Sequence, residues 1–189
     1  MAYIPKLYYL VGPSGAGKDC LLRQLKKKQY FSHQPLVGHR YITRPVREND
    51  ENHIELSPFD FLRRQQGGHF LFDWVSHGNQ YAIGREVLEW LRSGRDVIVN
   101  GSRAYLYKAR EIYPPLVPIW MKVSDDVLRT RLYKRGRENP TEIEYRILRN
   151  RELNEQNPGD CVYITNDLLI ENTVGQLMVE LESKKREYA

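Results

Sequence analysis

A glycine-rich segment directly after an apolar run constrains the fold of this chain more than any other part of its sequence. The segment Gly12-Pro13-Ser14-Gly15-Ala16-Gly17-Lys18 follows the apolar run Leu7–Val11 and precedes a stretch with helical spacing. A GxxxxGK pattern between a strand and a helix wraps an anion with backbone N–H groups, and the helix dipole adds positive charge. The pattern therefore predicts a phosphate-binding loop in which Lys18 reaches the β- and γ-phosphates of a nucleotide.

Asp19 follows this lysine, where a serine or threonine hydroxyl usually meets Mg²⁺. A carboxylate can also bind the metal, either directly or through water. We therefore expect the segment from Gly12 to Asp19 to hold ATP with Mg²⁺. In this prediction Lys18 is a catalytic side chain and Asp19 is the metal-binding one.

Buried strands and helices alternate along the rest of the chain. Short apolar runs predict strands over 7–11, 96–100, 117–123 and 161–165. Apolar spacing predicts helices over 18–28, 58–64, 86–92, 104–112, 125–134, 142–153 and 174–186, and Thr141 with Glu144 predicts a capping box. This alternation predicts an α/β three-layer fold, with a central parallel sheet between helices.

The 189 residues have room for one domain, which we divide into a core, an insertion and a lid. The segment 37–84 is aromatic and basic and does not follow the strand–helix alternation, so we expect an insertion folded over the edge of the sheet. The core takes 1–36, 85–130 and 154–189, and the lid takes 131–153. No apolar run is long enough to cross a bilayer and the N-terminus lacks a signal sequence, so we expect a cytoplasmic protein that does not bind membranes.

Positive charge is distributed in a way that favours a small anionic ligand. The chain has 29 Lys and Arg against 24 Asp and Glu, a net charge of +5, and its arginines fall in separate short clusters. No nucleic-acid recognition motif accompanies them, so we expect no nucleic-acid partner. The insertion offers guanidinium and hydroxyl groups suited to a phosphate, on Arg40, Thr43, Arg44 and Tyr81.

A second arginine cluster predicts a lid over the transferring group. The segment from Arg131 to Arg137 ends one predicted helix, and Arg146 lies on the next. We expect Arg135, Arg137 and Arg146 to be catalytic by neutralising charge that develops during phosphoryl transfer, with Gly136 as a joint.

These segments resemble the guanylate-kinase-like branch of P-loop kinases over nearly the whole chain. The phosphate-binding motif of that branch appears as Ile42-Thr43-Arg44, and the tyrosine-glycine motif as the segment from Tyr81 to Gly84. Within the branch, the sequence is similar to ribose 1,5-bisphosphate phosphokinases, enzymes of phosphonate breakdown that make 5-phosphoribosyl 1-diphosphate. The strings that carry this similarity are Gly12 to Asp19, His39 to Arg44, Glu51 to Ile54, Val99 to Ala104 and Arg135 to Glu138.

A departure from guanylate kinase itself bears on the acceptor. Where that enzyme has a strand ending in Asp-x-Asp, this chain has Asn100, Gly101 and Ser102, followed by Arg103. Replacing carboxylates by neutral groups and a cation suits an acceptor with two phosphates and no base. The resemblance thus implies transfer from ATP to ribose 1,5-bisphosphate, with Asn100, Ser102 and Arg103 also in the substrate site and Arg103 on the second phosphate.

Two other functions remain open from the sequence. A nucleoside monophosphate kinase, with GMP as acceptor, would share the fold and the donor loop. A non-catalytic guanylate-kinase-like binding module would share the fold alone, and the intact loop from Gly12 to Lys18 argues against it.

Overall fold

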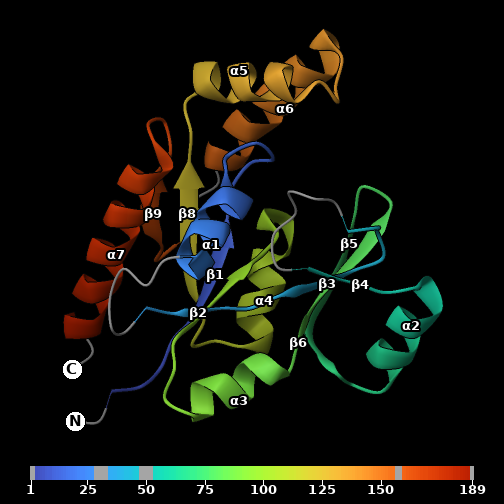
Figure 1. Ribbon diagram of the computed structural model, residues 1–189, viewed down its shortest axis with the longest axis vertical. Helices are drawn as coiled ribbons and strands as arrows, with labels where there is room; N and C mark the ends of the chain where they lie inside the picture. The colour runs from blue at the N-terminus through green and yellow to red at the C-terminus, as the bar shows by residue number, and fades with distance from the viewer. Residues whose placement is uncertain (1–2, 28–33, 47–52, 156–158, 188–189) are drawn as a thin grey trace.

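A sheet of five parallel strands forms the centre of the computed structural model, which describes residues 3–27, 34–46, 53–155 and 159–187. The strands lie in the order β2-β7-β1-β8-β9 (Figure 1). Their bounds are β1 Leu7–Val11, β2 Leu36–Val37, β7 Val97–Asn100, β8 Val117–Lys122 and β9 Val162–Thr165. Every pairing between them is parallel, so their carboxyl ends lie along one edge of the sheet.

Helices cover both faces of this sheet, because alternate residues of its strands are apolar on both sides. Tyr8 and Leu10 of β1 pack in a core with α1 (Lys18–Lys27) and α7 (Ile170–Glu187). Tyr9, on the opposite face, packs in a second core with α3 (Glu86–Arg92) and α4 (Leu106–Ile112). The predicted α/β three-layer fold is therefore confirmed (Figure 1).

The chain after β2 builds a second sheet beside the first (Figure 1). Its strand order is β4-β3-β6-β5, and one helix, α2, packs against it. The bounds are β3 Arg40–Ile42, β4 His53–Glu55, α2 Pro58–Gln66, β5 Phe70–Ser76 and β6 Asn79–Gly84. Its own small core contains Tyr41, Phe61, Phe70 and Ala82.

Two helices form a hairpin above the carboxyl edge of the central sheet (Figure 1). They are α5 (Asp125–Arg135) and α6 (Pro140–Glu155). Gly136 ends α5 with a left-handed φ of 65°, and its N–H donates to the carbonyls of Leu132 and Tyr133. The left-handed conformation explains why glycine stands at this helix end.

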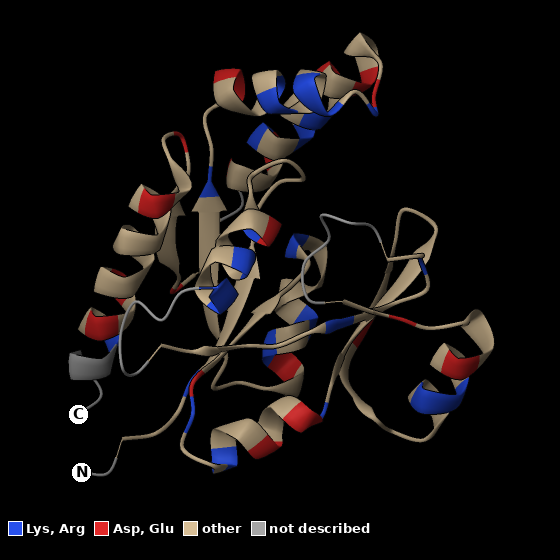
Figure 2. Cartoon of the chain, in the orientation of Figure 1, with Lys and Arg blue, Asp and Glu red and all other residues tan. Residues whose placement is uncertain are grey.

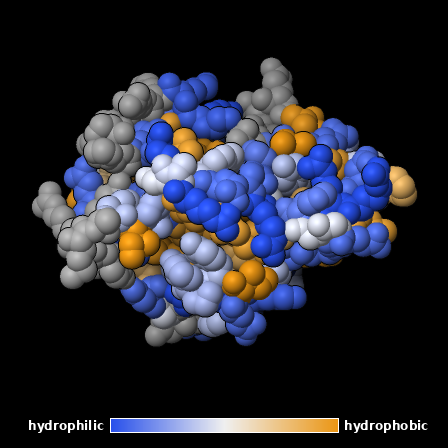
Figure 3. Space-filling model, turned by 90° about the horizontal axis from the view of Figure 1, so that it is seen from below, coloured by the Kyte–Doolittle hydropathy of each residue, from blue (hydrophilic) through white to orange (hydrophobic). Residues whose placement is uncertain are grey.

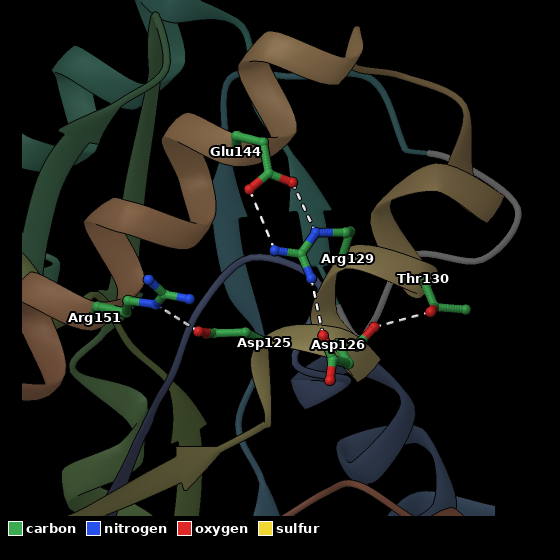
Figure 4. Close-up of polar contacts among 6 residues, drawn as sticks. All are labelled: Asp125, Asp126, Arg129, Thr130, Glu144 and Arg151. Carbon is green, nitrogen blue, oxygen red and sulfur yellow. Dashed lines mark hydrogen bonds and ion pairs between the residues drawn. The ribbon is translucent and has the colours of Figure 1, made fainter.

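Ion pairs connect the two helices of the hairpin (Figure 4). Arg129 donates to both carboxylate oxygens of Glu144, at 2.7 and 3.2 Å, and to Asp126 at 3.0 Å. Arg151 of α6 donates to Asp125 at the start of α5. Because this network leaves Arg129 beside carboxylates, its charge is not available to a ligand.

Several boundaries differ from the predicted ones. The capping box of α6 is formed by Asn139 and Glu142, which exchange bonds of 2.8 and 2.9 Å, so the prediction of Thr141 with Glu144 is wrong. Asn139 precedes Pro140 at the first helical position, and the helix therefore starts earlier than predicted. The helix expected over 104–112 begins as a 3-10 turn, η1 (Arg103–Tyr105), and α7 begins at Ile170 rather than at residue 174.

The short strand β2 was not predicted, and it places Val37 in the central sheet, not in the insertion as expected. A strand of two residues is too short to show the apolar run or the alternation by which strands are recognised in a sequence. The string from Glu51 to Ile54 lies partly outside the described residues. The division into core, insertion and lid otherwise stays a prediction. None of the helices over the described residues is both long and apolar enough to cross a bilayer.

A close contact between His39 and Glu86 joins the second sheet to α3. His39, just before β3, lies with Nε2 at 2.9 Å from Oε1 of Glu86 and at 3.2 Å from the Tyr41 hydroxyl. Burial by itself raises the pKa of Glu86, but His39, a backbone hydrogen bond and the Tyr41 hydroxyl together outweigh burial, so this pKa lies below its ordinary value. The ionised carboxylate therefore stabilises the folded state.

We predict that Glu86→Gln destabilises the protein at neutral pH and that the loss disappears in acid. A carboxylate whose pKa is depressed contributes stability above its unfolded pKa of about 4.3, and that contribution is lost as the pH falls through the lower folded value. The measurement is urea unfolding of both proteins between pH 7 and pH 3. A difference in unfolding free energy that stays constant over this range would contradict the ion pair.

Candidate active site

The glycine-rich segment forms a loop at the carboxyl end of β1, as its sequence predicts. Gly15 and Gly17 both have a φ of 95°, a conformation that disfavours residues with a Cβ. A Cβ on Gly17 would lie 2.4 Å from Nδ2 of Asn166. Lys18 donates to the carbonyls of Gly12 at 2.8 Å and Pro13 at 3.0 Å, so its ammonium group lies over the loop itself.

Two side chains from distant parts of the chain hold the back of this loop. Asn166, which is buried just after β9, donates from Nδ2 to the Ala16 carbonyl at 2.6 Å and accepts from the Thr173 hydroxyl at 2.9 Å. Arg131 of α5 donates to the same carbonyl at 3.3 Å. The loop is thus fixed by donors to the Ala16 carbonyl, while the Ala16 N–H itself donates to the Pro13 carbonyl at 3.1 Å.

Asp19 connects the loop to the neighbouring strand end. Its Oδ1 accepts from Nδ2 of Asn100, the last residue of β7, at 2.8 Å, and lies 3.8 Å from Nη2 of Arg40. Asn100 is 1% exposed, which orients the amide firmly. The structure therefore brings together three residues predicted for the site: Asp19 for the metal, and Asn100 and Arg40 for the acceptor.

The side of the site toward the second sheet is cationic and aromatic. The Arg40 guanidinium carbon lies 5.6 Å from the ring centre of Tyr81, and that ring stacks on Trp74 at 5.7 Å with an interplanar angle of 6°. Thr43 accepts the Gln80 N–H at 2.9 Å through its hydroxyl, so this side chain joins β3 to β6. Arg44 follows it and is partly buried.

The turn after β7 leaves Arg103 partly buried. The Ser102 N–H donates to the Tyr9 hydroxyl at 3.0 Å, and Nη1 of Arg103 donates to Oδ1 of Asn150 in α6 at 2.8 Å. Burial, together with the nearby charge of Arg149, lowers the pKa of Arg103 to about 10. At neutral pH this guanidinium remains charged.

The lid arginines differ in what they contact. Arg135 donates from Nη1 to the Ser14 hydroxyl of the loop at 3.3 Å, and it shares Oε1 of Glu138 with Arg146. The buried Nε of Arg135 has no hydrogen-bond partner among the described residues, which suits an incoming phosphate oxygen. Arg137 is exposed, and no contact with a described residue brings it to the loop. Lys and Arg side chains recur along α5 and α6 (Figure 2).

Several residues of the site were not predicted as site residues from the sequence. Asn166 has one recognisable signal, its place immediately after a buried strand. Asn150 has another, because it continues the buried stripe of Ile143 and Ile147 at helical spacing although it is polar. Glu138 and Arg131 lie in the predicted lid, but their partners are set by the packing of α5 on the loop.

The donor set fits a nucleoside triphosphate with Mg²⁺. Over the described residues, no three His, Cys, Asp or Glu side chains gather to hold a metal ion. Mg²⁺ in such sites is held by one or two carboxylates together with substrate phosphates and water. The carboxylate of Asp19 beside the loop is sufficient for that arrangement.

We predict that Asn166→Asp weakens nucleotide binding. The new carboxylate would face the Ala16 carbonyl, to which the Asn166 amide now donates a hydrogen bond. Losing a buried hydrogen bond of this kind costs about 1–3 kcal/mol. Calorimetric titration with ADP should therefore show an affinity lower by about tenfold or more, whereas Asn172→Asp, an exposed change nearby, should leave it unchanged. Equal affinities of the two variants would contradict the role of Asn166.

Known proteins resemble this chain in sequence and in fold. No model of a protein family matches it. The chain is 49% identical over 170 residues to a ribose 1,5-bisphosphate phosphokinase PhnN from Pectobacterium parmentieri, with 89% of each chain covered. It is 40% identical over 188 residues to the PhnN of Thiobacillus denitrificans, with 97% of this chain and 98% of the relative covered.

Among solved structures, the guanylate kinase from Anaplasma phagocytophilum has a TM-score of 0.73 at 17% identity, covering 98% of this chain and 88% of the other. That likeness supports the fold alone. The similarity to PhnN proteins extends over nearly the whole chain, including the loop, the second sheet and the lid. On this basis the chain belongs to the ribose 1,5-bisphosphate phosphokinase family.

Proposed function

We propose that this protein transfers the γ-phosphoryl group of ATP to a phosphate of ribose 1,5-bisphosphate, giving 5-phosphoribosyl 1-diphosphate and ADP. One observation carries the proposal: cations from two directions surround a phosphate loop that contains a single carboxylate, Asp19. Family membership supplies the chemical identity of the acceptor. A nucleoside triphosphate donor also fits the cytoplasmic location expected from the sequence.

The donor binds along the loop from Gly12 to Asp19 in this proposal. Backbone N–H groups and the amino end of α1 stabilise the phosphates, and Lys18 moves from the loop carbonyls to the β- and γ-phosphates. Asp19 would hold Mg²⁺, which supplies charge neutralisation on the phosphate oxygens. The bond from Asn100 fixes the carboxylate in place.

The acceptor lies on the other side of Asp19. Arg40 and Arg44 would hold the phosphate that is to be phosphorylated, with the Tyr81 hydroxyl as a further donor. Ser102, two residues after the end of β7, would also contact the acceptor, while Thr43 contributes by joining the segments that carry Arg44 and Tyr81. Arg103 would contact the second phosphate.

The reaction itself requires alignment more than acid–base catalysis. An acceptor phosphate is already ionised at neutral pH, so an oxygen of that phosphate can attack directly. A new P–O bond forms to this oxygen while the bond between the γ-phosphorus and the bridging oxygen of ADP breaks. Arg135, Arg137 and Arg146 neutralise the charge on the transferring group, and Glu138 holds two of them together.

The acceptor experiment distinguishes this proposal from a guanylate kinase. Purified protein is incubated with ATP, Mg²⁺ and either ribose 1,5-bisphosphate or GMP, and the products are followed by ³¹P NMR. We expect a diphosphate to form from the sugar bisphosphate and little turnover of GMP. Faster phosphorylation of GMP would support a nucleoside monophosphate kinase instead, and ATP binding without phosphorylation of either acceptor would support a binding module.

A second prediction concerns the lid. Arg135→Ala should lower kcat by about a thousandfold, with a smaller effect on the KM for ATP, because an arginine on the transferring group acts mainly in the transition state. Lys134→Ala, at an exposed neighbouring position, is the matched control and should remain within twofold of the wild type. Steady-state kinetics at saturating acceptor makes the comparison, and a kcat for Arg135→Ala within threefold of the wild type would remove Arg135 from catalysis.

A further inference from the structure

Arg103 has an unusual environment for a partly buried cation. Its Nη1 is bonded to the neutral amide of Asn150, and its guanidinium carbon lies 6.0 Å from the ring centre of Trp120. None of the carboxylates in the described part of the chain lies within ion-pair distance of it. Its charged neighbour is instead Arg149, which has the same sign and lowers the pKa of Arg103.

An arrangement of this kind is costly without a ligand. A charge that has lost part of its hydration is stabilised by a partner of opposite sign, and a single hydrogen bond to an amide offsets only part of that loss. The neutral partner is itself held firmly, since Asn150 is 1% exposed. An arriving phosphate dianion would supply the missing charge.

The partners of Arg103 come from the lid helix α6. One turn beyond Asn150, Oδ1 of Asn154 accepts from Nε1 of Trp120 at 3.1 Å, so the same helix face also holds the aromatic ring beneath the guanidinium. One turn before Asn150, Arg146 pairs with Glu138 and thus with the arginine that touches the phosphate loop. Helix α6 therefore contacts Arg103 directly and is linked to the phosphate loop through Glu138 and Arg135.

We propose that Asn150 is a positioning residue for acceptor specificity: it aims Arg103 at the acceptor phosphate that is not phosphorylated. The inference rests on the proposed function and extends it, because it assigns selection of a bisphosphate over a monophosphate to the lid. A neutral amide suits this role, since it orients the guanidinium without neutralising it. A carboxylate at position 150 would pair with Arg103 and neutralise the charge that the phosphate needs.

The test is Asn150→Asp, which keeps the shape of the side chain and its ability to accept from Arg103. We expect the KM for ribose 1,5-bisphosphate to rise about tenfold or more, with kcat and the KM for ATP within about twofold of the wild type. Without ligand, the midpoint of thermal unfolding should rise, because Arg103 gains an ion pair. A purely structural Asn150 predicts the same gain in stability with no change in the KM for the acceptor, and that result would overturn the proposal.

Two further variants make the result interpretable. Arg103→Met keeps an apolar stem over Trp120 and should also raise both the KM for the acceptor and the unfolding midpoint; a normal KM would contradict the subsite even if Asn150→Asp does not fold. Thr141→Asp adds the same charge at an exposed position of α6 and should leave the KM for the acceptor unchanged. An equal rise in KM for Thr141→Asp would mean that charge on the helix, and not the contact with Arg103, is responsible.

Failure of the inference and failure of the proposed function remain distinguishable. Calorimetric titration of ribose 1,5-bisphosphate into wild-type protein, in the presence of ADP, measures acceptor binding without turnover. If the wild type binds and phosphorylates this acceptor and Asn150→Asp has an unchanged KM for it, only the role of Asn150 is overturned. A wild type that neither binds nor phosphorylates this acceptor would overturn the proposed function and, with it, the inference.

Discussion

The site depends on one physical constraint: several cations are gathered around the phosphate loop with few carboxylates to neutralise them. Lys18 donates to backbone carbonyls, Arg131 to the Ala16 carbonyl and Arg103 to an amide. Neutral acceptors of this kind hold a cation in place without cancelling its charge. The structure is therefore prepared for polyanionic ligands, and the two carboxylates that do enter the site, Asp19 and Glu138, each contact two of its side chains.

The fold explains how these groups meet. Parallel strands bring their carboxyl ends to one edge, so the loop after β1, Asn100 at the end of β7 and Trp120 in β8 lie in adjacent positions of the sheet. The second sheet contributes Arg40 and the stacked Tyr81 from one side. Helix α6 adds the ion pair of Arg146 with Glu138 and the hydrogen bond that Asn150 accepts from Arg103. Exposed ion pairs between α5 and α6 keep this hairpin together, as Figure 4 shows.

The face of the molecule seen from below shows hydrophilic side chains interspersed with small apolar patches (Figure 3). Exposed apolar residues such as Ile4 and Leu168 are ordinary on a protein surface.

The central sheet and the phosphate loop could be predicted from the sequence, because both depend on local patterns. Continuous apolar runs such as Leu7–Val11 identify strands buried on both faces, and the loop is identified by glycine spacing and Lys18. The second sheet could not be predicted in detail, since its register depends on pairing across distant segments. The same holds for Asn166 and Asn150, whose roles depend on partners 150 and 47 residues away. The prediction that Thr141 caps α6 was wrong because Asn139, two residues earlier, forms the equivalent hydrogen bonds.

A crystal structure with ADP and ribose 1,5-bisphosphate bound together tests the central claim most directly. The account predicts the β-phosphate of ADP in the loop from Gly12 to Lys18, one acceptor phosphate beside Arg40 and Tyr81, and the other within hydrogen-bond distance of Arg103. A bound acceptor whose phosphates contact none of these arginines would contradict it.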